Sequence, residues 1–143
     1  MTGFNVIRDI DDKGLKMVAV SSLTAAIGDL LELVAGSTTW AKVTSSSNYF
    51  TRKAICMETL TAASQALVYE LNGTETVEAE VANAADAAHN GDRMLFTDEN
   101  TVNNTGTDNT GQTVGFVQSG VGRDTTHVIG RVIVGPGVDP DAT

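Results

Sequence analysis

Short apolar runs separated by turn residues recur along most of this chain. Residues 65–71 alternate apolar and polar side chains and are followed by Asn72-Gly73. Such alternation predicts a half-buried β-strand, and Asn-Gly is a strong hairpin-turn signal. Residues 125–134 are rich in valine, isoleucine and threonine, which favour strands. Shorter runs of the same kind predict further strands at 16–20, 30–34, 38–43, 49–57, 91–96 and 113–118.

Two segments are less regular. Residues 76–81 alternate with period two, whereas residues 82–89 are alanine-rich. We therefore expect a strand followed by a short helical segment that Asn90-Gly91 ends, and the alternative is one helix over 76–89. Residues 98–112 consist mainly of asparagine, threonine, glycine and aspartate, which predicts a long loop.

Many short strands with no regular alternation of strand and helix indicate an all-β protein with minor α content. We expect one small β-barrel or β-sandwich domain over residues 16–135, an extended N-terminal arm over 1–15 and a C-terminal tail over 136–143. The acidic cluster at 9–12 ends any first element. The arm is too polar for a core, so its removal is expected to leave the domain folded.

The sequence contains a possible internal duplication. Residues 25–33 resemble residues 87–96, and in both stretches a Gly-Asp pair precedes an apolar run. After a polar loop, 52–57 corresponds to 113–118, and 65–71 corresponds to 125–134. Two such units facing each other would close a barrel and hide most strand edges. The alternative is chance, because Gly-Asp before a strand is common.

Composition and charge limit the classes of partner that this protein could bind. The chain has 143 residues, a net charge of −9 and a sequence pI of about 4.4. Its nine basic residues are scattered, which argues against nucleic acid or an anionic membrane as a partner. No run approaches the roughly 20 apolar residues of a membrane span. The single cysteine excludes an intrachain disulfide, which fits synthesis in a reducing cytoplasm.

Residues that could support chemistry are few. Cys56 lies in an apolar run and is expected to be buried, while His89 and His127 have no evident catalytic partner. We therefore expect no enzyme activity, no metal and no cofactor. The 98–112 loop carries oxygen ligands suited to calcium but lacks EF-hand spacing. A sugar could instead stack on Trp40 or Tyr49.

The order of these features resembles the decoration, or cement, proteins that coat the heads of tailed bacteriophages. The similarity covers roughly residues 16–134 and consists of soft glycine and apolar patterns: Gly28-Asp29, Lys53–Met57, Gly91-Asp92, Val114–Val117 and His127–Val134. The resemblance implies a structural virion protein, made in the host cytoplasm, that binds the outer capsid surface as a trimer or dimer. Its partner would be the major capsid protein, and no catalytic residues carry over. The alternative is a receptor- or glycan-binding tail, fibre or surface module.

Three apolar residues of the arm are the candidate capsid contacts. Phe4, Val6 and Ile10 lie in a segment otherwise too polar for a core. We expect the arm to add a strand to a sheet edge of the capsid, with these side chains as anchors.

Overall fold

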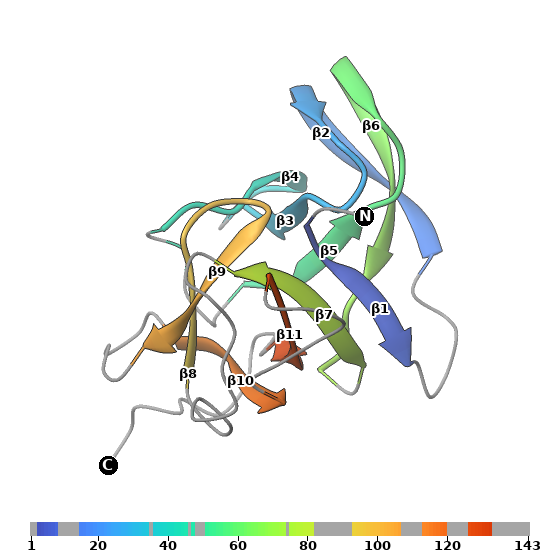
Figure 1. Cartoon of the computed structure of the whole chain (residues 1–143). Helices are drawn as coiled ribbons and strands as arrows, with labels where there is room; N and C mark the ends of the chain where they lie inside the picture. The colour runs from blue at the N-terminus through green and yellow to red at the C-terminus, as the bar shows by residue number, and fades with distance from the viewer. Residues whose placement is uncertain are drawn as a thin grey trace.

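A computed structural model shows an all-β protein whose strands form two sheets (Figure 1). It describes residues 3–8, 15–34, 36–45, 47, 51–73, 75–81, 93–106, 113–119 and 126–132. Within these ranges the strands are β1 (Asn5–Arg8), β2 (Leu15–Ala25), β3 (Leu30–Leu33), β4 (Thr39–Lys42), β5 (Lys53–Cys56), β6 (Leu60–Glu70), β7 (Thr76–Val81), β8 (Arg93–Phe96), β9 (Thr101–Gly106), β10 (Thr113–Ser119) and β11 (His127–Val132). The predicted all-β class and β-barrel are confirmed. The expected helical segment at 82–89 lies outside the described residues.

The first five strands after β1 form a closed barrel in the order β2-β4-β3-β5-β6. The β2–β4 pair is parallel and the other four pairs are antiparallel. Alternate side chains point inward and fill the barrel, as the pleat of a strand requires. This first core consists of Val20, Leu23, Ala25, Leu31, Trp40, Ala54, Cys56, Leu60, Ala66 and Val68.

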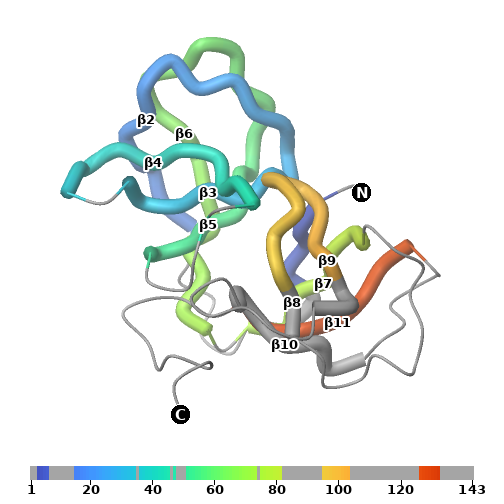
Figure 2. Tube along the Cα trace, turned by 90° about the vertical axis from the view of Figure 1, so that its left-hand side faces the viewer, coloured from blue at the N-terminus to red at the C-terminus, as the bar shows by residue number. Residues whose placement is uncertain are grey.

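The two long strands of this barrel bend sharply. Ser22 in β2 and Ala62 in β6 have positive φ angles of 44° and 45°, and the β2–β6 register shifts near both residues. The backbone N–H of Ala62 donates to Thr24 Oγ1 at 3.1 Å. Such bulges turn a strand corner, and the paired chains arch over one end of the barrel (Figure 2).

The second sheet has the order β1-β7-β11-β10-β8-β9 and returns on itself through a β7–β9 pair. This pair is parallel, and the β7–β11, β11–β10, β10–β8 and β8–β9 pairs are antiparallel. Strands β7 to β11 therefore form a second five-stranded ring beside the first barrel (Figure 2). β1 adds to the edge of β7.

The two rings are copies of one topology. In each, the first strand pairs in parallel with the third and antiparallel with the fifth, and the second strand pairs with the third and fourth. The registers also correspond. Ala19 and Val20 lie opposite Thr39 and Trp40 in the first ring, and Glu80 and Val81 lie opposite Thr101 and Val102 in the second.

The predicted duplication is thus confirmed, with β3, β5 and β6 corresponding to β8, β10 and β11. The expectation that the two copies together close one barrel was wrong, because each copy closes its own ring. The expectation of a hairpin turn at Asn72-Gly73 was also wrong. This turn joins the two rings, and β6 and β7 do not pair with each other. The buried Glu75 carboxylate caps this turn by accepting from the N–H groups of Asn72 and Gly73 at 3.0 and 3.1 Å.

A second core joins the rings. Leu30, Ile55 and Tyr69 point away from the first barrel and belong to the same cluster as the interior of the second ring. Their neighbours Leu31, Ala54 and Val68 point into the first barrel. The second cluster is made of Phe4, Leu30, Val43, Ile55, Tyr69, Leu71, Val77, Ala79, Phe96, Val102, Val128 and Val132.

The N-terminal segment belongs to this second core. Phe4 is fully buried and meets Phe96 edge-on, with ring centroids 6.2 Å apart. Its backbone N–H donates to the Gly28 carbonyl at 2.8 Å, and β1 pairs antiparallel with β7. The premise that this segment is too polar for the core is wrong for Phe4. Removing it would leave a hole in the core.

Two further expectations needed correction. Residues 98–112 are not a continuous loop, because β9 begins at Thr101 and buries Val102 completely. Pairing with β7 and β8 outweighs the poor strand propensity of the asparagines. The competing helix over 76–89 is also wrong, because residues 76–81 form β7.

The contact between the N-terminus and the Gly28 turn generates a prediction. A Cβ at Gly3, whose φ is +77°, would lie 2.5 Å from the Gly28 carbonyl oxygen, whereas a Cβ at Gly36, with φ of +72°, would meet nothing within 4 Å. Gly36→Ala should lower the free energy of unfolding by about 1 kcal/mol, from backbone strain alone. Gly3→Ala should cost roughly 2–4 kcal/mol. Urea denaturation measures both, and equal losses would contradict the proposed close approach.

Candidate interaction surface

An apolar stripe crosses the outer wall of the first barrel. Leu15 and Met17 of β2 are 59% and 56% exposed, the highest values among the exposed large hydrophobic residues described. Met17 lies opposite Leu67 of β6, and the N–H of Met57 donates to the Leu67 carbonyl at 2.9 Å. Met57 is itself 39% exposed. These three exposed side chains and the partly buried Leu67 thus form one stripe across β2, β6 and the residue after β5. Contiguous exposed apolar surface often marks a protein contact.

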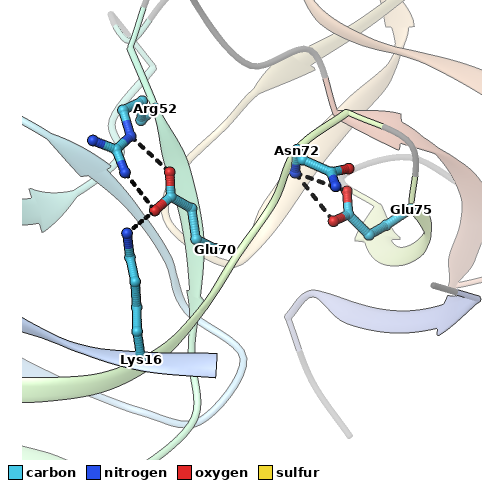
Figure 3. Close-up of polar contacts among 5 residues, drawn as sticks. All are labelled: Lys16, Arg52, Glu70, Asn72 and Glu75. Carbon is cyan, nitrogen blue, oxygen red and sulfur yellow. Dashed lines mark hydrogen bonds and ion pairs between the residues drawn. The ribbon is translucent and has the colours of Figure 1, made fainter. Parts of the chain in front are cut away.

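A charged cluster lies where β2 and β6 pair, on the face of the two strands opposite the stripe. Arg52 Nε and Nη2 each donate to a Glu70 carboxylate oxygen at 2.6 Å, and Lys16 Nζ pairs with the same carboxylate (Figure 3). The cluster therefore carries two cations and one anion. The bidentate Arg–carboxylate geometry fixes both side chains.

Trp40 lies beside the cluster and supports it. The Lys16 Nζ and Arg52 Cζ atoms are 6.0 and 5.7 Å from the Trp40 ring centroid, within the range of cation–π attraction. The indole itself is only 4% exposed and belongs to the first core. Trp40 is therefore not the open stacking platform that sugar binding would need, and Tyr49 lies outside the described residues.

The cations determine the ionisation of Glu70. Burial by itself would raise the pKa of this carboxyl, but the hydrogen bonds and charges of Arg52 and Lys16 outweigh it, so the pKa is lowered. Glu70 is therefore held as an anion, and the cluster keeps one net positive charge on a chain of net charge −9.

A second polar network is buried nearby. Lys53 is fully buried and donates to the carbonyl and Oγ1 of Thr51 at 2.8 and 2.6 Å. Thr51 Oγ1 donates to Glu32 at 2.9 Å, and Ser47 donates to the other oxygen of that carboxylate. Burial lowers the pKa of Lys53 to about 8, against the opposing attraction of Glu32. The network links β3 and β5 to the segment between β4 and β5.

The residues considered for chemistry lie apart. Cys56 is buried as predicted, and burial raises the pKa of its thiol. His127 is 7% exposed, and its Nδ1 lies 2.8 Å from Thr126 Oγ1. His89 lies outside the described residues. Over the described ranges, no three His, Cys, Asp or Glu residues gather in a way that could hold a metal ion.

Polar groups of the oxygen-rich segment form hydrogen bonds within its own turn. Asp98 Oδ1 accepts from the Asn100 N–H at 2.9 Å, and the Thr97 N–H donates to the Thr101 carbonyl at 3.0 Å. Residues 107–112 of the predicted ligand loop are not among those described. In the part of the chain that the structure covers, there is also no helix with the length and apolar character needed to cross a membrane.

The predicted contact residues do not form one exposed surface. Phe4 is buried, Val6 is partly buried against the second core, and Ile10 is outside the described ranges. Sequence reasoning instead missed Leu15, Met17 and Met57. The sequence did contain a signal for them. Residues 15–20 are apolar at every position except Lys16, whereas a strand with one buried face needs apolar residues only at alternate positions.

Comparison with known proteins gives no relative: no family model, no curated protein and no solved structure matches the chain.

The charged cluster generates a pH-dependent prediction. Because the pKa of Glu70 is lowered on folding, its contribution to stability is present above its unfolded pKa and is lost as the pH falls through the folded value. Glu70→Gln should lower the free energy of unfolding by about 1–3 kcal/mol at pH 7 and by much less at pH 3. Urea titrations at both pH values test this, and an equal loss at both would contradict the ion-pair account.

Lys53 generates a prediction with a slope of the same sign, in the alkaline range. Its folded pKa of about 8 lies below its unfolded value, so the unfolded chain binds more protons between pH 8 and 10.5. Between those values the stability of the wild type should rise relative to Lys53→Met, by up to roughly 3 kcal/mol. Denaturation of both proteins at pH 7 and 10 measures the difference. A difference that stays constant with pH would show that Lys53 titrates normally.

Proposed function

We propose that this chain is a structural protein that docks onto a larger protein assembly, and specifically that it decorates the outer surface of a tailed-bacteriophage capsid. The observation that carries the proposal is the apolar stripe on the barrel wall, in which Leu15, Met17 and Met57 are exposed and Leu67 is partly buried. The two Gly-Asp strands that resemble decoration proteins are the equivalent second strands of the two rings. This supports the resemblance at the level of organisation.

The major capsid protein is the proposed partner, and the stripe replaces the N-terminal residues as the main contact. Phe4 holds the N-terminal strand within its own chain, so it is not available as an anchor on another protein. The stripe needs no unfolding to reach a partner. The acidic chain would remain soluble in the host cytoplasm before it adds to the virion surface as a dimer or trimer.

The energetics of decoration follow from mass action. A protein that binds the assembled shell and not its separated subunits stabilises the shell by RT ln(1 + [L]/Kd), about 2.7 kcal/mol per site at a hundredfold excess over Kd. Many such sites together resist the internal pressure of packaged DNA. A fully apolar interface is not required, because each contact needs only moderate affinity.

Cosedimentation with purified, expanded and undecorated capsids tests this function. The wild type should pellet with capsids in a saturable manner, and Met57→Glu should weaken the binding roughly tenfold because it places an uncompensated charge in the stripe. Val34→Glu is the matched control: Val34 is also 39% exposed but lies after β3, outside the stripe. Absence of wild-type binding would contradict the proposal, and binding to a glycan or cell envelope would favour the receptor module.

A further inference from the structure

The internal repeat exposes a difference between the two rings. In the second ring, β9 pairs with the end of β7, at Glu80 and Val81, and β1 covers the beginning of the same edge, at residues 76–78. In the first ring, β4 pairs with Ala19 and Val20 of β2. Among the described strands, none pairs with residues 15–18 on the side opposite β6.

The registers make the comparison residue by residue. Glu80 and Val81 correspond to Ala19 and Val20, because each pair faces the parallel third strand of its ring. Counting back along both strands, residues 76–78 correspond to residues 15–17. The antiparallel fifth strands agree with this alignment: β11 lies opposite β7 as β6 lies opposite β2.

The covered and uncovered edges differ in burial as this correspondence requires. Val77 and Glu78, beneath β1, are 2% and 8% exposed. Their counterparts at the edge of β2, Lys16 and Met17, are both exposed, Met17 by 56%. A strand edge with exposed apolar side chains is the usual template for an added strand. β1 therefore shows within this molecule how such an edge is filled.

We propose that the edge of β2 at residues 15–18 receives an extended segment of the partner protein, which adds antiparallel to β2 as β1 adds to β7. This inference deepens the proposed function and rests on it, because it names how the docked partner is held. Main-chain hydrogen bonds would supply affinity, and side chains of the added segment would supply specificity.

The charges at the edge indicate the chemistry of this segment. Alternate residues of an added strand would lie beside Leu15 and Met17 on the outer face, and the residue between them would lie beside Lys16 on the other. Apolar residues suit the first two positions. The middle position faces the cluster of Lys16, Arg52 and Glu70, which keeps one net positive charge, so an aspartate or glutamate fits it. The expected segment alternates apolar, acidic and apolar residues.

A second copy of this chain is a poorer occupant. If two β2 edges met around a twofold axis with Leu15 opposite Met17, Lys16 would face Lys16 of the other copy, and directly opposed like charges destabilise a strand pair. The N-terminal strand of another copy is also committed, because Phe4 anchors it in its own core. A partner of different sequence is favoured.

Synthetic peptides test the mode directly. The first probe is a capped eight-residue peptide that alternates valine and threonine and has glutamate at its centre. The second carries lysine at the centre, and the third is the glutamate peptide with N-methylated backbone amides, which cannot complete a strand ladder. Fluorescence anisotropy measures their binding to the full chain. The variant Leu15→Lys/Met17→Lys blocks the edge, and Ile27→Lys/Val34→Lys adds the same charge at exposed apolar positions elsewhere.

The glutamate peptide should bind the wild type and the control variant alike, and bind the edge variant roughly tenfold more weakly or worse. The lysine peptide and the N-methylated peptide should each bind the wild type more weakly than the glutamate peptide does, by a similar factor. If the N-methylated peptide binds the wild type as tightly as the unmodified glutamate peptide, strand addition is wrong. This test needs no variant of the protein. If the edge variant binds the glutamate peptide as well as the wild type does, the proposed site is wrong. If the wild type forms a dimer that the edge substitutions abolish, the proposed occupant is wrong.

The same variants separate this inference from the function. If the edge variant cosediments with capsids as well as the control, the docking mode fails while decoration stands. If the glutamate peptide selects the β2 edge but no capsid binds the wild type, the mode stands while decoration fails.

Discussion

The fold depends on strands of the first barrel that are buried on both faces. Along β3, β5 and β6, one set of side chains fills the barrel and the alternate set fills the core shared with the second ring. A shift of one residue in any of these strands would exchange the two sets. Leu30, Ile55 and Tyr69 would be exposed if the rings separated, so the two copies form one cooperative unit. The Tyr69 hydroxyl is buried with no hydrogen-bond partner in the described region, which indicates that apolar packing decides where this ring lies.

The turn before β3 ties this arrangement to the N-terminus and to the second ring. The Gly28 carbonyl accepts from Phe4, the Gly28 N–H donates to the Cys56 carbonyl at 2.9 Å, and the Leu30 N–H donates to the Glu99 carbonyl at 2.6 Å. Asp29 is 5% exposed and accepts from the Ala26 N–H at 3.0 Å. Burial raises the pKa of Asp29. Three segments that are distant in sequence therefore meet at this turn.

Local patterns in the sequence predicted the parts that depend on neighbouring residues. The Gly-Asp pairs marked equivalent strands because each turn directs an apolar run into a core, and the alternation over 65–71 identified most of β6. Pairing between distant strands was not predictable in the same way. β9 is rich in asparagine and exists because Val102 completes the second ring. Phe4 lies in a polar segment, and its burial depends on an edge of β7 that only the ring topology leaves open.

The asymmetry between the copies has a physical rationale. A five-stranded ring of this topology leaves part of its first strand unpaired, because the parallel third strand reaches only the far end of it. A chain with two uncovered edges could join two partners at once and form open-ended chains, which is the hazard of exposed strand edges. A chain with both edges covered would have no strand to offer. Among the described strands, covering the edge of β7 with β1 leaves the corresponding edge of β2 open, and anchoring β1 through Phe4 prevents it from leaving to fill the β2 edge of another copy. With the β7 edge filled and the β2 edge open, strand addition at these two equivalent edges is limited to one partner segment, which is the stoichiometry that the proposed addition of one chain to each site of an assembly requires.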